Sequence, residues 1–376
     1  MMDMGRPKLG FKGYTEDWEQ RKLGDVVEFL DTMRKPLEGA KRISGPYPYY
    51  GASGIVDYVD GYLFDEELVL LSEDGANITD RNYPVCFLAS GKYWVNNHAH
   101  VLKTKDGNEN NFICNSLERK DYKQYNSGMA MPKLNQEVCR GIPISCPSFD
   151  EQKKIGDYFR NLDHIITLHQ RKCDEMKKLK KYMLQKMFPR KGMNVPEIRF
   201  NGFTDAWEQR KVSEMCSIAT GKSNTQDKIE DGEYPFYVRS PIIERSNKYL
   251  YDEEAVLTVG DGVGTGKVFH YVNGKYDLHQ RCYRMYDFSD KLNAKYFFQV
   301  FSKMFYRRVM AMTAKTSVDS VRMEMIADME IPVPSIEEQV QISRYLEDFD
   351  HLITLHQRKC EELQLLKKFM LQNMFI

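Results

Sequence analysis

The side chains best suited to specific chemistry are hydrogen-bonding groups, and they first gather in the stretch 92–100. Asparagine can bond two atoms of an adenine edge, and lysine can bond a guanine edge. The candidates here are Lys92, Tyr93, Asn96, Asn97, His98 and His100. The alternative interpretation is a strand with an ordinary solvated face. We predict that this stretch contacts nucleic-acid bases.

A second group in the other half of the chain offers the same chemistry. Its members are Arg239, Ser240, Lys267, His279, Gln280, Arg281 and Arg284. A third group precedes two helical stretches and carries hydroxyl and cationic side chains, namely Ser127, Lys133, Lys315, Thr316 and Ser317. Such groups suit contacts to phosphate oxygens, which position a protein on nucleic acid without specifying a sequence.

Catalytic motifs are missing or degraded. The segment GDGVGTGK at 260–267 departs from the phosphate-loop pattern, which requires Gly in place of Asp261 and Ser or Thr in place of Val268. The sequence has no [DN]-P-P-[YFW] segment and no G-x-G-x-x-G after a strand. We therefore predict no catalytic residue, and a glycine-rich hairpin at 260–267.

One histidine–cysteine pattern leaves two interpretations open. His169 and Cys173 are four residues apart, as are His356 and Cys360. If the two helical segments that carry them pack antiparallel about their centres, the four side chains meet. They could form a tetrahedral zinc site, or they could be small or polar residues that fix the register of a coiled coil. We predict the second arrangement and no metal.

The sequence consists of one module that occurs twice, and the residues named above lie within its two copies. DHIITLHQRKC at 163–173 and DHLITLHQRKC at 350–360 agree at ten of eleven positions, 187 residues apart. FKGYTEDWEQRKL at 11–23 and FNGFTDAWEQRKV at 200–212 match at a spacing of 189. Only the ends of the module are similar in sequence between the two copies. Two similar frames that enclose unlike middles should hold two different ligands.

The repeated segments 151–188 and 338–375 are predicted to be helices. Their apolar positions recur at alternating spacings of four and three, which is typical of a coiled-coil seam. The seam residues are Ile155, Phe159, Leu162, Ile166, His169, Cys173 and Met176 in the first helix, and Ile342, Leu346, Phe349, Ile353, His356, Cys360 and Leu363 in the second.

The two middles are predicted to be mixed sheet and helix, so the fold class is α/β in the α+β sense. Strand-like runs occur at 47–59, 67–77, 92–102, 233–243, 254–272 and 282–288, and a helical stretch at 292–312. Asp74-Gly75 and Asp261-Gly262 suit tight hairpin turns. The predicted domains are 1–150, a helix at 151–190, 191–336, and a helix at 337–376.

Composition indicates an ordinary soluble protein, with 42% hydrophobic and 29% charged residues and no run of membrane-spanning length. Its eight cysteines form no C-x-x-C pair, so we expect a reducing cytoplasm and no disulfides. The formal net charge is zero, although 151–191 holds 12 basic against 5 acidic residues. Affinity for nucleic acid would therefore come from local clusters or from a partner.

The doubled frame resembles the specificity (S) subunit of type I restriction–modification enzymes. The residues that carry the resemblance are Trp18 to Leu23, Pro147 to Gln152 and Leu168 to Lys172, and, in the second copy, Trp207 to Val212, Pro334 to Gln339 and Leu355 to Lys359. The resemblance covers nearly the whole chain. It implies that each middle is a target-recognition domain that reads one half of a bipartite site in double-stranded DNA.

The resemblance also implies partners. The two helices would form an antiparallel spacer, two methyltransferase (M) subunits would dock on the repeated regions, and motor-nuclease (R) subunits would join them. The chain itself would be non-catalytic and need no cofactor; S-adenosylmethionine would belong to the M subunits, and ATP with Mg²⁺ to the R subunits. Two alternatives are a stand-alone DNA-binding protein and a coiled-coil scaffold with no role on DNA.

Overall fold

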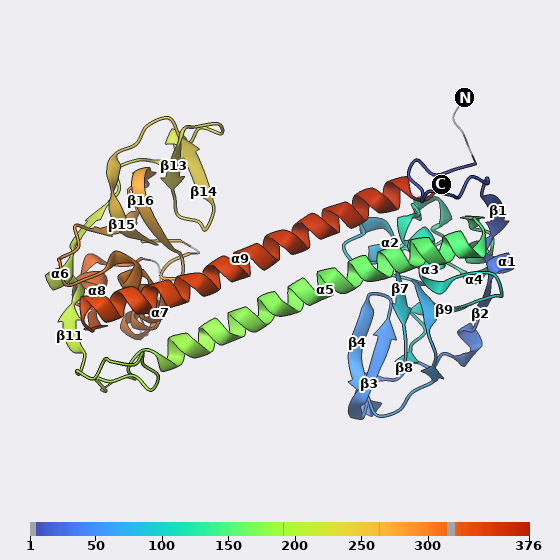
Figure 1. Cartoon of the computed structure of the whole chain (residues 1–376), viewed down its shortest axis with the longest axis horizontal. Helices are drawn as coiled ribbons and strands as arrows, with labels where there is room; N and C mark the ends of the chain where they lie inside the picture. Colours follow the sequence, from blue (N-terminus) through green and yellow to red (C-terminus); the bar gives the residue numbers. More distant parts are fainter. Residues whose placement is uncertain (1–4, 191, 263, 314–319) are drawn as a thin grey trace. The chain divides into compact units, whose positions relative to one another are not determined.

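The chain folds into two compact units, Met1–Arg171 with Gln357–Ile376, and Lys172–His356. The computed structural model describes residues 5–190, 192–262, 264–313 and 320–376, and Figure 1 labels its elements. The division falls inside both long helices, α5 (Phe149–Lys186) and α9 (Ile336–Asn373). Each unit therefore combines one sheet-rich middle with a part of both helices.

The first unit contains two four-stranded sheets, ordered β2-β9-β6-β7 and β4-β3-β8-β5, and a two-stranded sheet β1-β10. Helix α3 lies against β6, β7 and β9. The bounds are β1 Glu19–Lys22, α1 Leu23–Val26, β2 Val27–Phe29, β3 Ser44–Gly51, β4 Gly54–Val59, β5 Phe64–Asp65, β6 Leu68–Ser72, α2 Asn77–Asp80, β7 Cys86–Ala89, β8 Lys92–Val95, β9 Ala99–Thr104, α3 Asn110–Arg119, α4 Gln136–Arg140 and β10 Pro143–Cys146.

The second unit contains a six-stranded sheet, ordered β12-β17-β15-β16-β13-β14, and a two-stranded sheet β11-β18. Helix α7 lies against β15 and β16. The bounds are β11 Glu208–Lys211, α6 Val212–Met215, β12 Ser217–Thr220, β13 Tyr234–Tyr237, β14 Ile243–Ser246, β15 Tyr251–Val259, β16 Phe269–Leu278, β17 Cys282–Tyr286, α7 Ala294–Thr313, α8 Met323–Ala327 and β18 Glu330–Val333.

The repeated frame forms the same two-stranded sheet in each unit. In the first unit β1 pairs antiparallel with β10, and Glu19 lies opposite Cys146. In the second unit β11 pairs with β18, and Glu208 lies opposite Val333. In each unit the WEQRK segment is thus held by a backbone ladder to the strand just before the long helix, β10 or β18. This ladder explains why both ends of each module are similar although the middles differ.

Each long helix is followed, two residues past its end, by a buried phenylalanine that packs on a repeated tryptophan. In the first unit Phe375 packs on Trp18 with ring centroids 6.2 Å apart, and also on Phe112 and Phe159. In the second unit Phe188 packs on Trp207 at 6.1 Å. Figure 1 shows the C-terminal end of α9 beside the elements of the first unit. Each core is therefore closed by the end of the helix that belongs to the other sequence repeat.

Contacts within each unit show that α5 and α9 run antiparallel. In the first unit Lys367 Nζ lies 2.6 Å from Asp163. In the second unit Lys180 Nζ lies 2.6 Å from Asp350, and these two residues are the repeat equivalents of the first pair. The fourteen predicted seam residues are all buried or partly buried. The predicted helices agree with α5 and α9 to within two residues at each end.

The two seam cysteines are buried and face backbone of the opposite helix. Cys173 Sγ lies 3.9 Å from the carbonyl oxygen of Ile353, and Cys360 Sγ lies 3.6 Å from that of Ile166. Among the described residues, no group of three or more His, Cys, Asp or Glu side chains could hold a metal ion. These contacts favour the packing interpretation of the histidine–cysteine pattern over the zinc interpretation.

Most strand-like runs are confirmed, and the glycine-rich segment 260–267 does lie in a hairpin between the antiparallel strands β15 and β16. The prediction that Asp74-Gly75 and Asp261-Gly262 form tight turns is wrong. Asp74-Gly75 leads from β6 into α2, not directly into the paired strand β7. Asp261-Gly262 lies in the longer connection 260–268 between β15 and β16. Both loops instead approach the segment before the long helix, through bridges from Asp74 to Lys133 and from Asp261 to Ser320. None of the described helices is long and apolar enough to span a membrane.

The buried end of α9 leads to a first prediction. We expect Phe375→Ala to lower the free energy of unfolding of the first unit by about 3–5 kcal/mol, because a buried ring that contacts three others is replaced by a cavity. Hydrogen exchange followed by mass spectrometry would measure the loss unit by unit. Phe369→Ala, on the same helix and 52% exposed, is the control and should change stability by less than about 0.5 kcal/mol. Equal effects of the two variants would contradict the docking role.

Candidate nucleic-acid interface

A three-residue turn between β8 and β9 presents two exposed polar side chains in the first unit. Asn96 is buried. Its backbone N–H donates to the Tyr50 carbonyl at 3.0 Å, and its side-chain Oδ1 accepts from the backbone N–H of His98 at 2.8 Å. This side chain closes the turn from inside. Asn97 and His98 are left at the tip, exposed to solvent.

The second unit builds the same turn between β16 and β17 from different residues. His279 is buried. Its backbone N–H donates to the Tyr237 carbonyl at 2.9 Å, and its ring Nδ1 accepts from the backbone N–H of Arg281 at 3.0 Å. Burial, followed by the charge of Arg239, lowers the pKa of His279, which keeps Nδ1 free to accept. Gln280 and Arg281 are exposed at this tip. The turn geometry is therefore shared and the exposed side chains differ.

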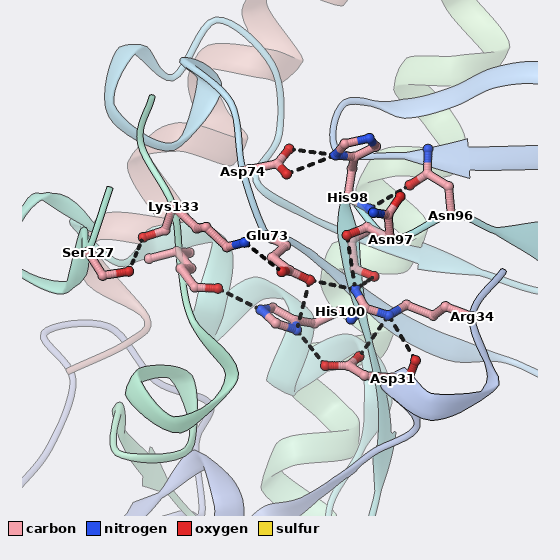
Figure 2. Close-up of polar contacts among 12 residues, drawn as sticks. Asp31, Arg34, Glu73, Asp74, Asn96, Asn97, His98, His100, Ser127 and Lys133 are labelled. Carbon is pink, nitrogen blue, oxygen red and sulfur yellow. Dashed lines mark hydrogen bonds and ion pairs between the residues drawn. The ribbon is translucent and has the colours of Figure 1, made fainter. Parts of the chain in front are cut away.

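An aspartate after the central strand lies beside each tip. In the first unit the Asp74 carboxylate contacts His98 Nδ1 at 2.8 Å, as Figure 2 shows. In the second unit Asp261 lies 3.3 Å from Arg239 Nη1 and 3.9 Å from Arg281 Nε. Together with the bridges to Lys133 and Ser320, the tip, the aspartate loop and the segment before the long helix form one surface in each unit. We name these two surfaces the recognition surfaces.

Beneath each tip, a side chain that is buried in the first unit and partly buried in the second attaches the segment that precedes the long helix. His100 Nε2 donates to the Leu134 carbonyl at 2.8 Å in the first unit. Tyr283 Oη donates to the Val321 carbonyl at 3.1 Å in the second unit. The two donors occupy the same place in their sheets, because His100 pairs with Leu71 as Tyr283 pairs with Thr258. Different side chains thus perform one structural task.

The first recognition surface rests on a buried network of charges (Figure 2). His100 Nδ1 donates to Asp31 at 2.6 Å, and Arg34 Nη1 lies 2.7 Å from Glu73 and donates to the Ala99 carbonyl at 2.7 Å. Burial alone would lower the pKa of His100, but its hydrogen bond to Asp31, together with Cys139, outweighs burial and raises the pKa to about 10. The same bond holds the pKa of Asp31 below its ordinary value despite burial. His100 is therefore an imidazolium at neutral pH, and it pins the tip to the core.

The structure separates the sequence candidates by exposure. Tyr93, Asn96, His100 and His279 have side chains that are 0–7% exposed, so they have little or no surface to offer a ligand and serve as scaffold. Arg284 pairs with Glu253 and lies between the rings of Tyr251 and Tyr286, at 4.2 and 3.6 Å from their centroids. It therefore belongs to the scaffold as well.

The remaining candidates are exposed or partly exposed, but they do not all gather at the recognition surfaces. Asn97, His98, Gln280 and Arg281 form the tips, and Arg239, Lys133 and Ser127 lie beside them. Lys92 is at the opposite end of β8, over the ring of Tyr62. Lys267 lies over Tyr306 of α7, and Ser240 accepts from the Ile242 N–H. Lys315, Thr316 and Ser317 lie outside the described residues.

Sequence reasoning missed Asp31, Arg34 and Glu73, which match no motif. Asp31 and Arg34 are three residues apart, but tertiary contacts bring Arg34 to Glu73 and Asp31 to His100. Sequence reasoning also did not recognise that VNNHAH and LHQRCY are equivalent. A signal for this was present, because the two segments share an apolar–polar order at a spacing of 183, against 187 for the helices. The two spacings differ because the segment between this turn and the repeated helix differs in length between the modules, and this difference hides the match.

Comparison with known proteins gives a consistent result. The family model described as "Type I restriction modification DNA specificity domain" matches residues 15–178 and 204–365. A similar protein is the type I restriction enzyme MjaVIII specificity subunit of Methanocaldococcus jannaschii, 22% identical over 94% of this chain and 91% of the relative. The putative specificity subunit S.HindORF215P of Haemophilus influenzae is 36% identical, over 36% of this chain and 35% of that protein. The crystal structure of the type I restriction–modification S subunit from M. genitalium superimposes with a TM-score of 0.78 at 12% identity, over 99% of both chains, so the two share a fold.

The His100–Asp31 pair leads to a second prediction. The folded-state pKa of His100, about 10, exceeds its ordinary value of 6.5, so its stabilisation is complete below pH 6.5 and is lost as the pH rises to about 10. We expect the free energy of unfolding of the first unit to fall across this window, by up to about 1.4 kcal/mol per pH unit from this one group. Urea unfolding at several pH values would measure it. His100→Gln should remove this part of the slope, and His164→Gln, an exposed residue of α5, should keep it; identical slopes in both variants would contradict the assignment.

Proposed function

The chain belongs to the family of type I restriction–modification DNA specificity subunits, whose domain it carries twice, and we propose that each recognition surface reads one half of a bipartite site in double-stranded DNA. As a specificity subunit it is a non-catalytic component. The observation that carries the proposal is the turn that occurs twice on one scaffold with unlike tips, Asn97-His98 and Gln280-Arg281. One scaffold with different tips suits two half-sites of different sequence.

The tips have the side chains for direct readout in the major groove. Asn97 and Gln280 can bond an adenine edge through two hydrogen bonds, and Arg281 can bond the O6 and N7 atoms of guanine. Asp261 lies 3.9 Å from Arg281 Nε, and so weak an exposed ion pair leaves the guanidinium available to a base. Lys133 and Ser127, which lie beside the first tip, suit contacts to phosphate oxygens.

We propose that the working assembly includes two methyltransferase (M) subunits and motor-nuclease (R) subunits, as the family implies. S-adenosylmethionine would then be bound by the M subunits, and ATP with Mg²⁺ by the R subunits, with no cofactor on this chain. The formal charge of zero supports a dependence on partners, because affinity for DNA comes largely from neutralised phosphates. Eight buried cysteines without a disulfide fit a reducing cytoplasm.

We further propose that α5 and α9 set the distance between the two half-sites. Each helix has 38 residues, or about 57 Å at roughly 1.5 Å per residue. The interhelical pairs Lys367–Asp163 and Lys180–Asp350 provide a fixed antiparallel register. A stiff spacer of this kind can present two readers to grooves at one separation.

The tips lead to a third prediction. We expect Arg281→Ala to relax discrimination at one position of one half-site by about 1–3 kcal/mol, or about 5- to 150-fold, because a bidentate base contact is lost. The other half-site should keep its specificity. The measurement is methylation by the assembled complex on duplexes that carry every single-base change in the site.

Two controls accompany this experiment. Asn97→Ala should relax the other half-site only. Arg210→Ala, which removes an exposed arginine of the repeated frame paired with Glu208, should leave both half-sites unchanged. Loss of discrimination in both half-sites from Arg281→Ala alone, or in neither, would refute independent reading by the two tips.

The spacer leads to a fourth prediction. Insertion of seven residues into both α5 and α9, after Arg171 and after Arg358, preserves the seam and lengthens the helices by about 10 Å at roughly 1.5 Å per residue. We expect the permitted gap between half-sites to grow by about three base pairs, since about 34 Å of duplex makes one turn. Insertion of two residues rotates the later seam by about 200° and should prevent assembly. Methylome sequencing would report the gap, and an active seven-residue variant with an unchanged gap would refute the proposal.

A further inference from the structure

A basic hollow of about 540 Å³ lies in the second unit, apart from its recognition surface. The end of α5 contributes Lys180 and Lys181 to its wall, α7 contributes Lys303 and Arg307, and α9 contributes Asp350. Four cations thus face one carboxylate. This concentration of charge contrasts with a chain whose formal net charge is zero.

The single carboxylate is already in use. Asp350 accepts two hydrogen bonds from Lys180 Nζ, at 2.6 and 2.7 Å. Among the described residues, Lys181, Lys303 and Arg307 form no ion pair, and Lys303 Nζ lies 4.6 Å from the ring centroid of Phe188. Burial and the charge of Arg307 lower the pKa of Lys303 to about 8. All three cations therefore lack a counter-charge. Lys181 and Arg307 are exposed and stay hydrated, whereas Lys303 is partly buried, where an unpaired charge is unfavourable.

A largely buried residue also contributes an amide to the wall of the hollow. Gln299 is 3% exposed and lines the hollow. The neighbouring Ser302 hydroxyl donates to the carbonyls of Phe298 and Gln299 at 2.7 and 3.2 Å, so its oxygen can still accept. An amide donor on the same wall as Lys303 and Arg307 suits an anionic ligand, because the amide and both cations can donate hydrogen bonds to it.

We propose that this hollow binds a phosphate group. Ammonium, guanidinium and amide donors from three side chains converge there, and a phosphate has enough oxygen acceptors for all of them. The volume lies within the range of sites that enclose a small ligand, and the partly buried Phe298 and Leu184 offer an apolar wall for an attached sugar or base. The phosphate can come from a free nucleotide or from the backbone of duplex DNA; only the second source rests on the proposed function.

The test uses the full-length chain and inorganic pyrophosphate as the probe, with binding followed by isothermal titration calorimetry. We expect Lys303→Met, Arg307→Ala and Gln299→Leu each to weaken binding about tenfold or more, since each removes one donor to an anion. Lys181→Ala should also weaken binding. Its matched control is Lys368→Ala, an exposed lysine at the equivalent position of the other repeat, which should leave binding unchanged. Circular dichroism would establish that each variant is folded.

The salt dependence of duplex binding separates the two sources. If the site holds a DNA phosphate, Lys303→Met should reduce the slope of log affinity against log salt by about 0.9. An unchanged slope together with lost pyrophosphate binding assigns the site to a free nucleotide. Absence of pyrophosphate binding to the wild type, or equal binding to Lys303→Met and wild type, would overturn the proposal. Half-site discrimination by Arg281 is measured separately, so failure of one proposal leaves the other intact.

Discussion

The structure depends on one packing interaction that occurs twice, the burial of the phenylalanine that follows each long helix against a repeated tryptophan. Phe375 completes the core around Trp18, and Phe188 completes the core around Trp207. Because each phenylalanine comes from the helix of the other repeat, neither core is closed by its own stretch of chain. The antiparallel course of α5 and α9, with their ion pairs Lys367–Asp163 and Lys180–Asp350, follows from this exchange. It also accounts for similarity at the two ends of each module.

The recognition surfaces show how such a frame can tolerate different readers. The residues that shape each turn are buried or partly buried and make equivalent hydrogen bonds, although Asn96 is replaced by His279 and His100 by Tyr283. The exposed tips carry no structural task of this kind, so they can change without loss of the fold. A buried ion network is costly unless every member is paired, and in the first unit His100, Asp31, Arg34 and Glu73 satisfy one another. The side chains that stabilise each turn are therefore different from the exposed side chains that are proposed to read DNA.

Positive charge that could attract a partner is concentrated at a few places in this chain. A formal charge of zero gives little long-range attraction to a polyanion, and ion pairs neutralise many of the surface cations. The tip of the second unit and the basic hollow at α7 are places where cations keep capacity for an external partner. Arg281 interacts with Asp261 only at 3.9 Å, and Lys303 and Arg307 have no acidic partner among the described residues. Binding by such a chain rests on a few well-placed groups.

The duplication, the two long helices to within two residues at each end, most strands and the family can all be read from the amino-acid sequence. These features are readable because helical periodicity and repeat spacing are local properties of the chain. The exposure of Asn97, His98, Gln280 and Arg281, and the burial of Tyr93 and His100 a few residues away, result from tertiary packing. It alone brought Asp31 and Arg34 to His100, across more than sixty positions, and Phe375 to Trp18. Burial and charge pairing depend on which distant segments meet, and a residue's local pattern carries no record of its distant neighbours.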